Sequence, residues 1–161
     1  KWEEERTKKA LAALEIIRPK LLTEKDPLQK YTELKTLIEY GASELDETVI
    51  PFILDEDLTK EQRTNLISSM GSHQSAASDA LFRRVLDEWN SGFWQFSEVC
   101  SAIYHFGNKV SDEGIVELQK LVDSSGDLNE GNKTEGKMAK AAIDGIKVKL
   151  AEAALKAELQ K

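Results

Sequence analysis

The segment 46–107 contains two consecutive patterns of helix, short turn and helix, and these patterns limit the folds open to the chain. In the first, apolar residues recur at helical spacing on both sides of the acidic turn 55–57. In the second, apolar stripes in 76–89 and 96–106 flank the turn 90–92. Alternating runs of β-branched residues, which predict strands, do not occur in the sequence. We therefore predict an all-helical protein.

Signals for helix starts support this pattern along the whole chain. Asp26 precedes a proline and is a predicted N-cap, because its carboxylate can accept a hydrogen bond from the first helical turn. Ser43 with Asp46, and Thr59 with Gln62, have the spacing of a capping box. We predict one repeat domain over 1–161, with an unusually long last helix. Its helices pair into hairpins at residues 1–41, 43–71, 76–107 and 111–161.

The second helices of the two central hairpins repeat each other. Ile67 and Gly71 match Ile103 and Gly107 after a shift of 36 residues. A period in the thirties, with two helices in each repeat, is typical of stacked helical hairpins that share a continuous core. We predict a right-handed stack of about four antiparallel hairpins, an α-solenoid; a single irregular helical bundle is the alternative.

The segment 49–71 has a proline in its first helix, an aspartate in its turn, a basic residue early in its second helix and a glycine at its end. These residues are Pro51, Asp57, Arg63 and Gly71. In this combination the segment resembles a HEAT repeat. The next hairpin departs from the pattern, with Phe93 and Val99 where Asp57 and Arg63 stand. The resemblance implies a curved stack of hairpins with a binding surface along the second helices.

Polar residues line the face opposite the apolar stripe on two of these second helices. An exposed Trp94 beside polar neighbours has the character of a binding hot spot. The apolar stripe itself includes Phe96 and Phe106, which we expect in the core. The predicted ridge that contacts a partner protein consists of Gln62, Asn65, Ser69, Trp94, Glu98, Ser101 and His105.

Acidic residues concentrate between positions 44 and 61, in a chain of net charge −7. The predicted acidic patch consists of Asp46, Glu47, Asp55, Glu56 and Asp57. A solvated surface explains it, and an inhibitor or immunity-type protein that covers a basic partner surface is the alternative. An acidic chain disfavours nucleic-acid binding, and with it a relationship to helical-repeat DNA glycosylases, which need a basic concave face.

The residues that could carry metal or covalent chemistry are few. Cys100 is the single cysteine, so an internal disulfide is excluded. With His73 and His105 it makes up the whole set of soft ligands, which is too few for a zinc site. The polar loop from Asp123 lacks the glycine and glutamate that an EF-hand needs at its sixth and twelfth positions. We expect no metal, no cofactor and no enzymatic activity.

These patterns together predict a non-enzymatic scaffold or adaptor that binds another protein along its second helices. The last helix is expected either to cap the end of the stack or to pair with another chain in self-association. No apolar run approaches membrane-spanning length, and a cytoplasmic location is favoured. The chain begins at Lys1 rather than at methionine, so a soluble domain of a larger or membrane-anchored protein is the further alternative.

Overall fold

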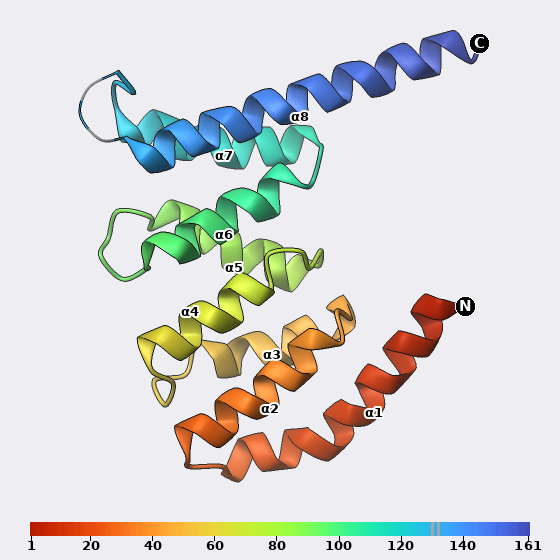
Figure 1. The fold of residues 1–161 in the computed structure, drawn as a ribbon, viewed down its shortest axis with the longest axis vertical. Helices are drawn as coiled ribbons and strands as arrows, with labels where there is room; N and C mark the ends of the chain where they lie inside the picture. Colours follow the sequence, from red (N-terminus) through yellow and green to blue (C-terminus); the bar gives the residue numbers. More distant parts are fainter. Residues whose placement is uncertain (130, 132) are drawn as a thin grey trace. The chain divides into compact units, whose positions relative to one another are not determined.

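The computed structural model describes residues 1–129, 131 and 133–161. Within these residues the chain is helical and contains no strand, so the prediction of an all-α protein is confirmed (Figure 1). Glu130 and Asn132, in the predicted polar loop, lie outside the described residues. The α-helices are α1 (Trp2–Thr23), α2 (Pro27–Glu39), α3 (Asp46–Ile53), α4 (Lys60–Ser69), α5 (Ala76–Asp87), α6 (Phe96–Gly107), α7 (Asp112–Ser125) and α8 (Thr134–Leu159). A short 3-10 helix, η1 (Ser43–Leu45), precedes α3.

Two predicted helix caps form as expected. The Asp26 carboxylate accepts a hydrogen bond from the Leu28 N–H at 3.2 Å. Thr59 and Gln62 make a reciprocal capping box, in which each backbone N–H donates to the other's side-chain oxygen, at 3.1 and 3.0 Å. Each cap stabilises its helix by about 1 kcal/mol, because it satisfies a backbone N–H that has no partner within the helix.

The capping box predicted for Ser43 and Asp46 is wrong. Ser43 begins η1, and Asp46 is the first residue of α3 rather than the third. The Asp46 carboxylate is buried and accepts from His73 and Ser75. Its long-range partners, 27 and 29 residues further along the chain, take the place of the local cap.

The chain forms two compact units, 1–81 and 82–161, and α5 runs through the boundary between them. In the first unit, α2 packs against α1, α3 and α4. Its core side chains come from all of these helices and include Leu21, Leu34, Leu37, Ile53, Leu66 and Ile67.

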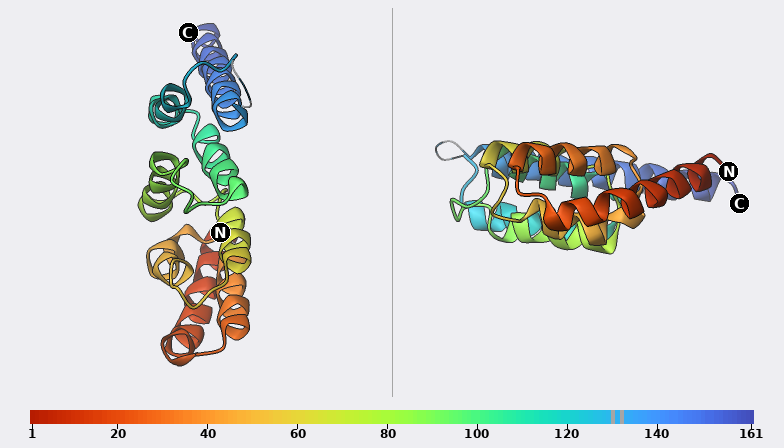
Figure 2. Two further views of the ribbon diagram at one scale, coloured as in Figure 1. Left: turned by 90° about the vertical axis from the view of Figure 1, so that its left-hand side faces the viewer. Right: turned by 90° about the horizontal axis from the view of Figure 1, so that it is seen from below.

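In the second unit, α6, α7 and α8 pack against one another (Figures 1 and 2). The core residues with the largest fully buried side chains are Phe82, Phe106, Leu118 and Leu121, joined by Ile143 and Ile146 from α8. Each helix therefore buries one stripe and leaves the opposite face to solvent. The distal part of α8 extends past α7, and residues 151–161 are all exposed.

Gly114 sets how closely α7 can approach α6. A Cβ at this position would lie 2.6 Å from the backbone carbonyl oxygen of Phe106 and 3.3 Å from Cδ1 of Ile146. A backbone atom cannot move aside without shifting its helix. Gly145, in α8, is the opposite case, since an added Cβ would lie more than 4 Å from every described residue outside its own helix turn.

Substitution of these two glycines tests the packing of α6 on α7. We expect Gly114→Ala to destabilise the chain by about 1–3 kcal/mol, because the added methyl group overpacks the contact. Gly145→Ala is the matched control and is expected to stabilise by up to about 1 kcal/mol through helix propensity. Urea titration followed by circular dichroism measures both, and equal midpoints for the two variants would contradict the close approach.

Candidate functional site

An apolar groove between α6 and α8 is the strongest candidate for a binding site in the second unit. Its volume is about 390 Å³. Its lining consists of Cys100, Ile103, Tyr104, Gly107 and Asn108 on one side and Met138, Ala141 and Ala142 on the other. Apolar atoms make up nearly all of the exposed lining, so the groove favours an apolar group over a charged one.

Small residues keep the groove open. Gly107 faces Ala142, and a Cβ on Gly107 would lie 3.5 Å from that of Ala142, in ordinary contact. At the mouth of the groove, Tyr104 is 57% exposed. An exposed aromatic ring beside an apolar groove is a common feature of protein-binding surfaces.

Cys100 lies in this groove, with its sulfur 3.9 Å from that of Met138. Burial raises the pKa of the Cys100 thiol, and the negative charge of Glu135 raises it further. A raised pKa keeps the thiol protonated at neutral pH and lowers its nucleophilicity. Cys100 therefore contributes apolar surface to the groove.

The predicted exposure of Trp94 is wrong. The predicted ridge assumes that Trp94 lies on the same helix as His105, but α6 begins at Phe96, and helical periodicity does not reach back to Trp94. The indole is only 5% exposed. It lies against the ring of Phe93 at 4.7 Å and under the guanidinium of Arg84 at 5.3 Å.

Glu98 and His105 are also buried, which corrects the predicted orientation of α6. The Glu98 carboxylate accepts the Gln95 backbone N–H at 2.7 Å, as the N3 residue of a capping box that the sequence analysis missed. The His105 ring stacks on Phe82 at 4.6 Å between ring centres. Phe96, expected in the core, is 54% exposed.

The exposed face of α6 is therefore rotated by about one residue from the predicted one. It carries Ser97 and Tyr104, with the half-buried Cys100 and Ser101 between them. Ser101 is the one member of the predicted ridge on α6 that reaches solvent. Its hydroxyl donates to the Ser97 carbonyl at 2.9 Å.

The predicted ridge residues on α4 are more exposed to solvent than those on α6, as the prediction requires. Asn65 and Ser69 are exposed, and the Ser69 hydroxyl donates to the Asn65 carbonyl at 3.0 Å. Gln62 is half-buried because its side chain serves the capping box. Whether these residues contact a partner stays a prediction.

Two members of the acidic patch surround Lys30, whose side chain is buried. The Lys30 ammonium lies 2.7 Å from Asp57 and 3.9 Å from Asp55. This pairing neutralises part of the negative charge that the turn presents to solvent. Of the other predicted members, Glu47 and Glu56 are exposed.

Asp46, counted in the acidic patch, belongs instead to a buried polar cluster. His73 Nδ1 donates to one carboxylate oxygen at 2.7 Å, and the Ser75 hydroxyl donates to the other at 2.7 Å. Ser78 continues the cluster, 3.1 Å from Ser75. In a catalytic triad the serine would instead contact the far imidazole nitrogen. The geometry therefore indicates a clamp that ties the α4–α5 loop to the start of α3.

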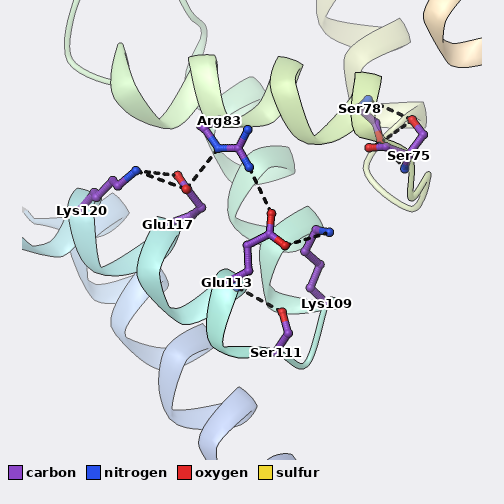
Figure 3. Close-up of polar contacts among 9 residues, drawn as sticks. Ser75, Ser78, Arg83, Lys109, Ser111, Glu113, Glu117 and Lys120 are labelled. Carbon is purple, nitrogen blue, oxygen red and sulfur yellow. Dashed lines mark hydrogen bonds and ion pairs between the residues drawn. The ribbon is translucent and has the colours of Figure 1, made fainter.

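A second polar network links α5 to α7 within the second unit (Figure 3). The Arg83 guanidinium bridges Glu113 and Glu117, at 3.1 Å to each. Lys120 binds Glu117 at 3.2 Å, and Lys109 lies 3.8 Å from Glu113. Glu117 is buried and has two cationic partners, so it is the anchor of the network. Sequence reasoning missed it, because Arg83 and Glu117 are 34 residues apart.

Among the described residues, no group of three or more His, Cys, Asp or Glu side chains could hold a metal ion. Likewise, none of the helices that the described residues form combines the length and apolar character needed to cross a bilayer.

Comparison of the chain with family models, curated proteins and solved structures finds no significant match. The resemblance of 49–71 to a HEAT repeat therefore stays a prediction. The candidate sites are therefore supported by their contacts and burial alone, and not by a related protein.

Removal of the Asp46 carboxylate tests the clamp. We expect Asp46→Ala to destabilise the first unit by about 2–3 kcal/mol, because it leaves the buried N–H of His73 without its acceptor and removes an acceptor from the half-buried Ser75 hydroxyl. Glu47→Ala is the matched control, an adjacent exposed carboxylate, and is expected to change stability by less than about 0.5 kcal/mol. Thermal unfolding of both variants measures this difference. Similar losses would mean that Asp46 acts only through surface charge.

The rate of Cys100 alkylation tests the electrostatics of the groove. Because its pKa is raised, we expect slower reaction with iodoacetamide at pH 7.5 than in the denatured chain, and a rate that still rises with pH after that of the denatured chain has levelled. Glu135→Gln is expected to shift this rate profile toward lower pH, whereas Asp144→Asn leaves it unchanged. An unchanged profile in Glu135→Gln would exclude the effect of Glu135.

Proposed function

We propose that this chain is a non-enzymatic protein-interaction scaffold, built from helical hairpins that stack as a right-handed, HEAT-like α-solenoid. The packing inside each unit supports the stacking. α2 packs against α4 in the first unit, and α6 packs against α8 in the second. Contact between alternate helices is what a stack of hairpins requires, since each second helix must cover the next.

The groove between α6 and α8 is the proposed binding surface, and its apolar lining is the observation that carries the proposal. A site for a polar metabolite needs several convergent polar groups. Here the side chains that offer polar atoms are mainly Tyr104 and Asn108, both exposed at the surface. A groove of this kind between two helices suits the apolar face of an amphipathic helix from a partner protein.

The acidic patch supports an inhibitor function less well. Asp46 is buried in the clamp, and the buried Lys30 pairs with Asp55 and Asp57. Asp55 and Asp57 are exposed, and the single positive charge of Lys30 offsets part of their attraction for a basic partner. The exposed carboxylates of Glu47 and Glu56 are a small part of the predicted patch.

Photo-crosslinking from the groove tests this function. Benzoyl-phenylalanine in place of Tyr104 is expected to form a covalent adduct with one partner protein in the native cell. Cys100→Arg places a charge in the groove and is expected to abolish the adduct, whereas Ser97→Arg, on the same exposed face of α6, preserves it. An adduct that survives Cys100→Arg would place the interface outside the groove. An adduct formed only from Asn65 would favour the predicted ridge on α4.

A further inference from the structure

The outer face of α8 is apolar, although it faces solvent. The helix buries Gly136, Ala139, Ile143 and Ile146 against its own unit. The opposite face carries an exposed stripe of positions at alternating spacings of three and four residues. Glu152 occupies one of these positions, and the others are Met138, Ala141, Gly145, Val148, Leu155 and Leu159. Leu155 is 62% exposed and Leu159 is 79% exposed.

This pattern is unusual for an outward-facing helix. A helix that only closes the end of a helical stack needs a polar outer face for solubility. The stripe instead has the three-four spacing of a coiled-coil seam, with Glu152 as the single charged residue within it. It extends roughly 30 Å along α8.

We propose that the outer stripe of α8 packs against the same stripe of a second copy of this chain, with the two helices antiparallel. The distal part of each α8, where residues 151–161 are exposed, would then cover the outer face of the part of α8 that packs on α6 and α7 in the other copy. The interface shares Met138 and Ala141 with the α8 side of the groove, whereas the α6 side of the groove takes no part in it. The observations that support the dimer are independent of the proposed function.

The charges that flank the stripe select one register. When Met138 lies opposite Leu155 of the second copy, Lys137 lies beside Glu158 and Glu135 beside Lys156 across the interface. The two-fold symmetry makes each of these pairs twice. Flanking charges of opposite sign are what set orientation and register in coiled coils. Glu158, now paired with Lys161 at 3.2 Å on the exposed helix end, is accessible to this second cation.

Other registers bring like charges together. A shift of one heptad in one direction places Asp144 against its own symmetry copy. A shift in the other direction places Asp144 against Glu158. In a parallel dimer, Glu152 would face Glu152 inside the seam, where a carboxylate pair is costly.

The core of the selected register is complementary in size. Leu155 covers Met138, and Val148 faces Gly145, whose missing side chain lets the helices approach closely. Glu152 faces Ala141, so its long side chain can reach water past the small methyl group. The seam is short and contains two small residues, so we expect a reversible dimer.

Cysteine crosslinking tests both the interface and its direction. In a Cys100→Ala background, the variants Met138→Cys and Leu155→Cys are oxidised separately and then as an equimolar mixture. We expect a disulfide-linked dimer only in the mixture, because the antiparallel register pairs position 138 with 155. Crosslinking of each variant with itself would show a parallel dimer and overturn the proposal.

A charge exchange tests the register independently. We expect Lys137→Glu and Glu158→Lys each to raise the dimer dissociation constant about tenfold or more in sedimentation, and the double variant to restore it. The two positions lie roughly 30 Å apart on one helix, so only a contact between copies can produce the rescue. Leu155→Lys is expected to abolish the dimer, whereas Val116→Lys, at an exposed apolar residue of α7, leaves it intact.

The outcomes separate this inference from the proposed function. A monomer at all concentrations, or a double variant without rescue, would overturn the dimer and leave the groove untouched. Self-association that persists in Leu155→Lys would place the contact between copies on another surface and also overturn the proposal. A dimer with the expected crosslinks supports the inference even if no partner protein is found on Tyr104.

Discussion

The structure depends on a single constraint, which is that each helix has one apolar stripe and needs a neighbour to cover it. In the first unit, α2 packs against α4, and Leu34 and Leu37 of α2 are buried, as are Leu66 and Ile67 of α4. Full burial of each such side chain contributes about 1.5–3 kcal/mol, which exceeds the net contribution of a typical hydrogen bond. The packing of alternate helices follows from this constraint. An apolar face that its own unit leaves uncovered is, for the same reason, a candidate binding surface.

Two such uncovered surfaces occur in the second unit, and both involve α8. The groove beside α6 exists because Gly107, Ala141 and Ala142 are too small to fill the space between the helices. The outer stripe exists because α8 has apolar residues on both of its faces. The groove suits an apolar segment of another protein, whereas the stripe and its flanking charges suit a copy of itself. On both surfaces, exposed apolar side chains can be buried by a binding partner, and this burial would favour binding.

The polar clusters perform a different task, which is to hold loops and helices in position. Asp46 ties the α4–α5 loop to α3, and Lys30 forms an ion pair with Asp57 in the acidic turn before α4. These charges are therefore structural, although the sequence places Asp46 within an acidic patch. The candidate ridge shows the same limit of sequence reasoning, since Trp94 and Glu98 are polar or aromatic residues that the fold buries.

The sequence by itself determined the helices, their order and several of their caps, because helical periodicity and capping involve residues only three or four positions apart. It did not determine which face of α6 meets solvent, because the polar character of Glu98 and His105 does not show that the fold buries them, one in a capping box and the other against Phe82. The clamp at Asp46 and the network around Arg83 join residues about thirty positions apart. Only tertiary packing brings such residues together, since the pattern of residues around each partner carries no signal of the other.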